Sequence, residues 1–211
     1  MSDCQDDSKC PRPYRLGQRQ VSADEKRARI VSAARDLLSS IREVSGFTMD
    51  SVARQAGVAR MTVYHQFGSK RGLLEAVFDE LGRTGLVDRL RAAFELPIAR
   101  DALAAFIGAF GSFWTANRLV IRRIRGLAVL DPDFEDGVRA REERRRKGLY
   151  VVLGRLTKEL GIPEVRDLDE AVQIVHTLTS FETFDALAGL NRSPDDITPL
   201  IQKMVNGILK L

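Results

Sequence analysis

The chain has 211 residues, of which 29% are charged and 44% are hydrophobic, and this ordinary globular composition excludes wholesale disorder and fibrous repeats. Its 33 basic and 29 acidic residues give a formal net charge of +4. The charge is unevenly distributed, because residues 1–71 hold 13 basic and 8 acidic residues while residues 72–211 hold 20 and 21. The basic excess therefore lies in the first third of the chain, where it permits contact with a nucleic acid without requiring it.

The sequence contains no apolar run of about 18 residues that could cross a bilayer, and its polar start is unlike a signal peptide. We therefore expect a cytoplasmic protein that does not contact a membrane. Cys4 and Cys10 lie in the polar start, far along the chain from His65 and His176, so neither a zinc site nor a disulfide framework is supported. We expect no metal and no cofactor.

The first apolar periodicity begins only after residue 21. Residues 1–21 have few apolar side chains and two prolines, which predicts a disordered tail. Its arginines could lie along DNA, although a solvated tail is the simpler interpretation. Ser22 and Glu25 then match a capping box, followed by apolar residues at helical spacing, so a first helix is expected from there to about Gly46.

Residues 48–67 predict two short helices joined by a tight turn. Thr48 suits the N-cap of a helix over about 49–56, which Gly57 would end. Apolar residues at staple spacing place a further helix at about 60–67. Two short helices joined so closely form a helix-turn-helix.

The second of these helices carries side chains suited to DNA, since in this motif it lies in the major groove. Arg60 can make a bidentate contact to guanine, and Thr62 offers a hydroxyl and a methyl group. By i, i+3 and i+4 spacing, His65 shares a face with Met61 and Thr62. Other donors can hold phosphates, which set the register without reading sequence; these are Tyr64, His65, Gln66 and Lys70.

This stretch closely resembles the tetracycline-repressor (TetR) family of bacterial transcription regulators. The residues that match the family's spacings are Ile30, Ala33, Ala34, Leu38, Thr48, Val52, Ala53, Ala56, Gly57, Val58, Thr62, Val63, Tyr64, Phe67, Ser69, Lys70, Leu73 and Leu74. The resemblance implies an N-terminal three-helix DNA-binding domain, here residues 22–71, and a C-terminal helical domain, residues 72–211, for effector binding and dimerisation. It further implies that Thr48 and Tyr64 contact phosphate and that Lys70 grips the DNA backbone. The residues implied to face the groove are Arg60, Met61, Thr62 and His65.

Two positions depart from the family pattern. Ala59 stands where many members have a hydroxyl or acidic cap at the recognition helix, and the loss of a cap costs about 0.5 to 2 kcal/mol. A DNA phosphate near that helix end could satisfy the free N–H groups instead. Met61 is bulkier than the small residue common at its position, so the base preference cannot be copied from a relative.

The remaining sequence is helical in pattern, without the alternating runs that indicate strands. We therefore expect an all-α protein of about nine helices, interrupted by a helix-poor stretch around Pro97. After a fourth helix capped by Ser69, the expected helices cover about 103–114, 118–130, 134–160, 167–187 and 193–209.

The last two helices are apolar over more than one stripe, so each must be covered on two sides. A two-fold partner in a four-helix bundle would supply the second cover. The residues expected at this dimer interface are Val172, Val175, Leu178, Ile201, Met204, Val205 and Ile208.

Aromatic side chains with few charges suit a pocket for an apolar or aromatic small molecule. The residues expected to line it are Phe110, Phe113, Trp114, Tyr150, His176 and Phe181. Plain core packing is the alternative for each of them, and for His176 a hydrogen-bonded core position.

Two basic clusters lie outside the helix-turn-helix. The run 139–147 is interrupted by Glu142 and Glu143, which favours a solvated helix face over a second nucleic-acid site. The arginines of 118–125 could contact either the DNA-binding module or solvent.

The sequence thus predicts a homodimeric repressor that binds double-stranded operator DNA and is released by a small-molecule effector. An activator, or a DNA-binding regulator without a ligand, is the alternative. A helical enzyme or a protein-docking module is less well supported, because none of the common nucleophile, phosphate-loop or zinc motifs is present, and we expect no catalytic residues.

Overall fold

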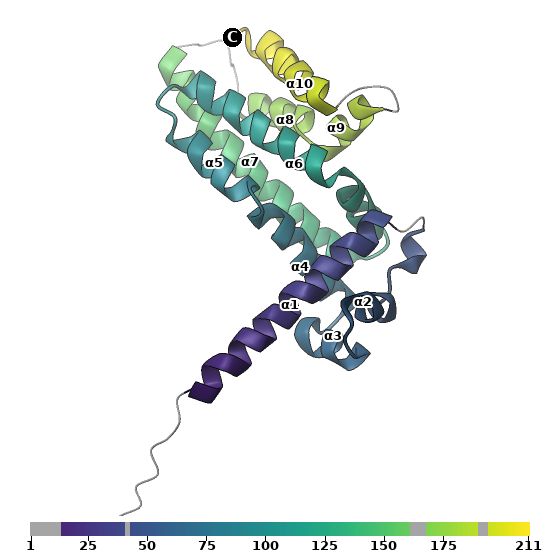
Figure 1. The fold of residues 1–211 in the computed structure, drawn as a ribbon. Helices are drawn as coiled ribbons and strands as arrows, with labels where there is room; N and C mark the ends of the chain where they lie inside the picture. The colour runs from purple at the N-terminus through teal and green to yellow at the C-terminus, as the bar shows by residue number, and fades with distance from the viewer. Residues whose placement is uncertain (1–13, 41–42, 161–167, 190–193) are drawn as a thin grey trace, which may run out of the picture.

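The computed structural model describes residues 14–40, 43–160, 168–189 and 194–211. Within these ranges the chain forms ten α-helices and one short 3-10 helix and has no strand, which confirms the all-α class (Figure 1). The helices are α1 (Tyr14–Ser40), η1 (Val44–Gly46), α2 (Met49–Ala56), α3 (Arg60–Phe67), α4 (Lys70–Arg83), α5 (Leu86–Glu95), α6 (Ala99–Ala128), α7 (Pro132–Leu160), α8 (Leu168–Leu178), α9 (Phe181–Ala188) and α10 (Pro194–Leu209).

Helices α1 to α4 form the N-terminal module. The second half of α1 packs on α2 and α4, and Ile30, Ala34 and Leu38 are buried in this core with Phe47 and Val63. Figure 1 shows the first half of α1 running out beyond α2 and α3. Because only the second half carries the apolar stripe, packing anchors α1 at one end.

Helix α1 begins at Tyr14, so residues 14–21, which we expected in the tail, are helical. Arginine, leucine and glutamine in this stretch are good helix formers, and the sequence has no proline between residues 14 and 40 to interrupt the helix. The capping box at Ser22 therefore lies inside the helix and does not start it. Residues 1–13 lie outside the described part of the chain.

The body is built on α5, α6 and α7, which lie side by side in Figure 1. Arg155 of α7 secures the turn between α5 and α6, donating hydrogen bonds to the carbonyls of Phe94 at 3.0 Å and Leu96 at 2.5 Å. Glu159, one turn further on, accepts a hydrogen bond from the first N–H of α6, on Ala99. The end of α7 thus supplies the cap that the start of α6 lacks.

Two predicted boundaries in the body are wrong. The fifth and sixth expected helices are one continuous helix, α6, because Thr115, Ala116 and Asn117 between them include no breaker. The single helix expected over 167–187 is divided into α8 and α9, because the Ser180 side chain caps a new helix by accepting from the N–H of Thr183. The predicted helix-start residues at 167 and 193 lie outside the described residues.

Helix α5 was not expected. Its residues Leu86, Leu90 and Phe94 do have helical spacing and pack against the core. The helix follows Gly85 at a φ of 95°, a left-handed conformation in which glycine carries little strain. The start of α5 has no capping side chain, so the sequence gives no local signal for this sharp turn from α4 into α5.

Candidate DNA-binding surface and interior cavity

The local sequence explains why α2 and α3 form and where they end. Thr48 and Ser51 make a reciprocal capping box at the start of α2, with the Thr48 side chain accepting from the Ser51 N–H at 3.1 Å. Gly57 ends α2 at a φ of 62° and Gly68 ends α3 at a φ of 70°. Ala59 offers α3 no side-chain cap, as the sequence predicts, so the first N–H groups of α3 have no side-chain acceptor there.

The predicted DNA-binding residues lie on α3, at the N-cap of α2 and at the start of α4, and none of them is fully buried. Val63 is fully buried and holds α3 to the core, while Met61 on the other side is 60% exposed. Arg60, His65 and Thr48 are also exposed, and the half-buried ones are Thr62, Tyr64, Gln66 and Lys70.

Arg60 is held in place before any DNA is present. Its Nη2 donates to the Tyr64 hydroxyl at 3.3 Å, its Nε lies 3.3 Å from a carboxylate oxygen of Asp50, and its guanidinium lies 5.3 Å from the Tyr64 ring centre. The hydrogen bond to Tyr64 and the charge of Asp50 raise the pKa of Arg60. Arg60 therefore contacts both α2 and α3 while its side chain stays 57% exposed.

Lys70, at the start of α4, lies beside the same surface. Its ammonium nitrogen is 5.6 Å from the centre of the Phe47 ring. Burial lowers the pKa of Lys70, and the charge of Asp131 offsets part of that effect. The next residue, Arg71, pairs with Asp133 of α7 at 2.5 Å. The cationic start of α4 thus touches both the helix-turn-helix and the corner between α6 and α7.

Arg27 of α1 supports the recognition helix and was not singled out from the sequence. It donates to the carbonyl oxygen of Gln66 at 3.0 Å and lies 4.5 Å from the centre of the Phe67 ring. Both contacts are at the last turn of α3. An arginine near the C-terminal end of a helix also interacts favourably with the helix dipole.

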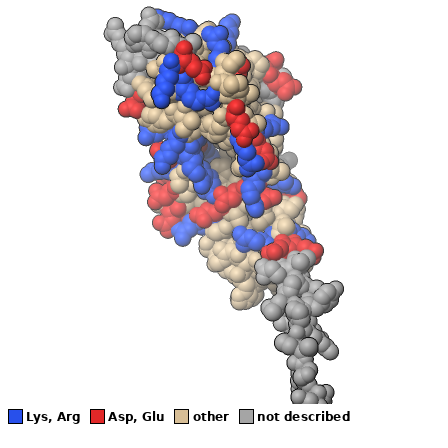
Figure 2. All heavy atoms as spheres, turned by 90° about the vertical axis from the view of Figure 1, so that its left-hand side faces the viewer, with Lys and Arg blue, Asp and Glu red and all other residues tan. Residues whose placement is uncertain are grey.

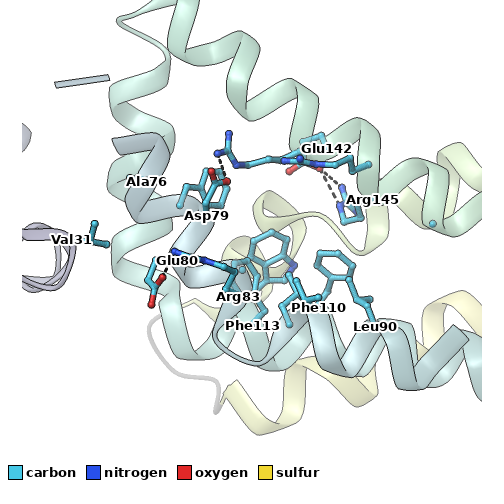
Figure 3. A pocket seen from close by; sticks show the side chains of 18 of the residues that line it. Val31, Ala76, Asp79, Glu80, Arg83, Leu90, Phe110, Phe113, Glu142 and Arg145 are labelled. Atoms are coloured by element: carbon cyan, nitrogen blue, oxygen red, sulfur yellow. Dashed lines mark hydrogen bonds and ion pairs between the residues drawn. The ribbon is translucent and has the colours of Figure 1, made fainter. Parts of the chain in front are cut away.

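A cavity of about 980 Å³ lies between the two modules, lined by α1, α4, α5, α6 and α7. Phe110 and Phe113 of α6 lie on one wall, and Glu142 and Arg145 of α7 lie across from them (Figure 3). The aromatic rings along α6 form a continuous series, with Phe106 and Phe110 at 5.0 Å and Phe110 and Trp114 at 5.6 Å between ring centres. Its size is that of a small-molecule site.

Three of the six residues predicted for a pocket line this cavity, namely Phe110, Phe113 and Trp114. Phe181 packs behind Trp114, with ring centres 5.6 Å apart. Tyr150 points elsewhere and donates to Asp169 at 2.5 Å. His176 is half-buried and hydrogen-bonded within the protein, with its Nε2 at 3.2 Å from the carbonyl oxygen of Glu142.

The run expected to be a solvated helix face is partly buried instead. Arg145 is only 5% exposed, and it donates to Glu142 at 2.6 Å and to the Thr179 hydroxyl at 2.7 Å. Arg125 of α6 pairs with the other carboxylate oxygen of Glu142. Burial raises the pKa of Glu142, but the hydrogen bond from His176 and the charges of the two arginines outweigh it and bring the pKa to about 2. This network could not be predicted from the sequence because its members come from three helices.

The arginines of α6 mostly bind acids of the body. Arg118 and Arg122 both pair with Asp185 of α9 at 2.6 Å. Arg123 instead donates to the carbonyl oxygen of Leu38 in α1. That contact joins the body to the DNA-binding module, which is one of the two partners considered for these arginines.

The structure places four of the seven predicted interface residues in the core of the single chain, namely Val172, Val175, Ile201 and Val205. They are covered by helices of the same chain because α8 packs on α7 and α10 packs on α6. Leu178 and Met204 are half-buried, and Ile208 is 48% exposed. Of the seven predicted interface residues, these three are the ones that keep apolar surface a partner subunit could cover.

Within the described ranges, no cluster of three histidine, cysteine, aspartate or glutamate side chains could hold a metal ion. In the same ranges no helix combines the length and apolar character needed to span a membrane. On the face shown in Figure 2, basic and acidic side chains are intermixed.

The α2–turn–α3 unit on an otherwise helical body defines the class of helix-turn-helix proteins. Residues 30–77 match the family model for "Bacterial regulatory proteins, tetR family". The HTH-type transcriptional regulator AlkX of Mycobacterium tuberculosis is 34% identical over 122 residues, which are 56% of this chain and 54% of that protein. The match therefore spans about half the length of this curated relative.

Solved structures share the fold over most of the chain. A TetR-family transcriptional regulator from Rhodococcus sp. has a TM-score of 0.68 at 20% identity, covering 88% of this chain and 98% of its own. A transcriptional regulator from Saccharomonospora viridis, solved in complex with choline, has a TM-score of 0.71 at 18% identity, covering 87% of this chain and 96% of its own. The match to the tetR family model thus covers residues 30–77, and over the rest of the chain the likeness to these solved structures is one of fold.

Proposed function

We propose that this protein is a homodimeric transcriptional repressor that binds operator DNA through α3 and is released by a small molecule bound in the interior cavity. The observation that carries the proposal is the recognition helix itself. It is fixed to the core by Val63 and presents Arg60, Met61 and His65 outward. In a helix-turn-helix those positions lie at base edges of the major groove.

The roles proposed for the DNA-binding residues follow from their places on the surface. Arg60, Met61, Thr62 and His65 read bases, while Thr48, Tyr64, Gln66 and Lys70 hold phosphates. The missing side-chain cap at Ala59 supports a phosphate at the start of α3, because free N–H groups at a helix N-terminus bind anions.

The effector site is proposed at the α6 aromatic wall. Phe110, Phe113 and Trp114 line a cavity that also touches α1 and α4 of the DNA-binding module. A molecule bound there contacts both modules and can favour one arrangement of them over another. The choline complex of the Saccharomonospora viridis regulator supports the idea that this fold accommodates a small molecule.

Dimerisation is proposed through the outer surface of α8 and α10, at Leu178, Met204 and Ile208. Two recognition helices related by a two-fold axis address two half-sites, which gives a palindromic operator. A four-helix bundle of α8 and α10 with their symmetry mates would make that pairing.

Selection of genomic fragments by the purified protein tests the proposed function. The expected result is enrichment of a palindromic site, with tight binding to that site and weak binding to a scrambled one. Repression is then tested with a reporter gene placed behind the selected site, whose output should fall when the protein is present. Enrichment of no common sequence would reject the proposal, and a rise in reporter output would establish an activator.

A further inference from the structure

The cavity has two chemically different ends. Its interior is apolar, with lining side chains between 1% and 7% exposed, namely Phe106, Phe110, Phe113 and Trp114. Its rim between α1, α4 and α7 is charged and contains Asp24, Arg27, Asp79, Glu80, Arg83, Arg141 and Arg144. A ligand that fills both ends has an apolar body and a polar head.

The charged pair in the cavity wall, Glu142 and Arg145, already has hydrogen-bond partners within the protein. Arg145 donates to Glu142, to Thr179 and to the carbonyl oxygen of His176. Both carboxylate oxygens of Glu142 accept from arginines, one from Arg145 and one from Arg125. A ligand ammonium at Glu142 would have to displace one guanidinium and would lie beside the other. This wall therefore disfavours a cationic head group.

Arg141 is the guanidinium that can change partners. Its Nη1 donates to the carbonyl oxygen of Gly137 at 2.8 Å, and its Nη2 donates to Asp79 at 2.5 Å. The side chain lies 4.9 Å from the centre of the Phe78 ring and is 17% exposed, whereas that of Asp79 is 58% exposed. An exposed carboxylate contributes little net free energy to such a pair. A second carboxylate delivered from the apolar side can therefore replace Asp79 as the acceptor at Nη2, in a charge-assisted hydrogen bond.

We propose that the cavity binds an amphipathic monocarboxylate, with its apolar body on the α6 aromatic rings and its carboxylate on Arg141 in place of Asp79. The inference rests on the proposed function in taking this cavity as the effector site. Asp79 belongs to α4 and Arg141 to α7. The exchange of carboxylates therefore removes one of the two ion pairs that join α7 to α4, the helix that begins at Lys70, and leaves the Arg71–Asp133 pair in place. The head group of the ligand is linked in this way to the DNA-binding surface.

Trp114 provides the readout, since it lines the cavity and is the only tryptophan in the chain. Its fluorescence is titrated with decanoate, decanol and decyltrimethylammonium, three probes with the same alkyl body and different heads. Decanoate should bind roughly tenfold more tightly than decanol, because a charge-assisted hydrogen bond is gained. Decyltrimethylammonium should bind more weakly than decanol.

Two substitutions break the Arg141–Asp79 pair from opposite sides and separate ligand binding from a structural effect. Arg141→Gln should abolish the preference for decanoate over decanol, whereas Asp79→Asn should strengthen decanoate binding because a competitor is removed. Arg139→Gln is the matched control, because Arg139 is an exposed arginine of the same helix that pairs with Glu135. It should behave as the unaltered protein does, and circular dichroism establishes that each variant is folded.

Several results would overturn the inference: no response of Trp114 to any probe, equal affinity for decanoate and decanol, or a shift in the same direction in Arg141→Gln and Asp79→Asn. Operator binding is measured separately with the same probes. If decanoate binds with the expected preferences while DNA stays bound, the release mechanism of the proposed function fails and the head-group assignment stands.

Discussion

Arg60 and Lys70 are both cations of the proposed DNA-binding surface, but their surroundings suit them to different contacts with DNA. Arg60 projects from the exposed face of α3 and is oriented by Asp50 and Tyr64, which suits the fixed geometry of a base contact. Lys70 lies at the edge of the surface beside the Phe47 ring, where a compact ammonium suits a phosphate. The two should therefore affect specificity and affinity differently.

Replacing Arg60 with Ala should relax the base preference at one position of each half-site, at a cost of about 1 to 3 kcal/mol on the preferred sequence. Lys70→Ala should weaken binding to all sequences alike. Competition binding with operators varied one base pair at a time measures both effects. If the two variants give the same profile, the groove assignment is wrong.

Gly111 shows how a single missing side chain sets the distance between two helices. A Cβ on Gly111 would lie 2.0 Å from the Thr198 hydroxyl oxygen, so α6 and α10 can approach only because glycine is there. Gly111→Ala should destabilise the protein by about 1 to 3 kcal/mol through overpacking. Gly108→Ala on the same helix meets nothing within 4 Å and should stabilise it by up to about 1 kcal/mol. Urea denaturation compares the two, and equal stabilities would contradict the close α6–α10 packing.

At the scale of helices, the buried network around Glu142 joins α6, α7 and α8. It holds Arg145 to the carboxylate, to Thr179 and to the carbonyl oxygen of His176. Removing one member of such a network leaves an unpaired buried charge, which is costly. The network should therefore make stability depend on pH.

Glu142 has a pKa of about 2 in the folded protein, below its ordinary value of 4.5. A lowered pKa adds stability that is fully present above pH 4.5 and is lost as the pH falls toward 2, and here it amounts to on the order of 3 kcal/mol. Glu142→Gln should be less stable at neutral pH and should lose less stability on acidification. Denaturation curves between pH 7 and pH 3 measure this, and parallel pH profiles for the two proteins would rule out the assigned role of Glu142.

The helices that could be predicted from the sequence are those whose ends are set by capping residues next to them in the chain. The expected ranges 49–56 and 60–67 coincide with α2 and α3, because Thr48, Gly57 and Gly68 act on residues next to them. Helix α5 and the division between α8 and α9 depend on a glycine turn and a single serine, which are weak signals in sequence. The burial of Arg145 could not be predicted, since a basic run indicates a solvated helix face. The residues that bury Arg145 come from three helices that are distant in the sequence.

At the scale of the whole molecule, the DNA-binding module is tied to the body along α4. Arg71 at its start pairs with Asp133, and Asp79 further along pairs with Arg141, both partners being on α7. Arg123 adds a third tie to α1 through the Leu38 carbonyl. Asp79 and Arg141 also line the cavity, so one of these ties lies in the cavity wall itself.

The proposed dimer is tested by placing a charge on its surface without disturbing the core. Ile208→Asp should leave the fold stable but shift the protein toward monomer, because Ile208 is 48% exposed in the single chain. Val129→Asp, at a residue 79% exposed in the corner between α6 and α7, is the control and should remain dimeric. Analytical ultracentrifugation distinguishes them, and an unchanged dimer for Ile208→Asp would exclude this surface of α10.

The central claim is that the surface of α2, α3 and Lys70 binds DNA, and the dependence of operator affinity on salt tests it most directly. Phosphate contacts release counterions, so the logarithm of the binding constant should fall linearly and steeply with the logarithm of salt concentration. Lys70→Ala should reduce the magnitude of this slope by about one for each copy of Lys70 that contacts a phosphate. A slope near zero, or one that Lys70→Ala leaves unchanged, would contradict the account.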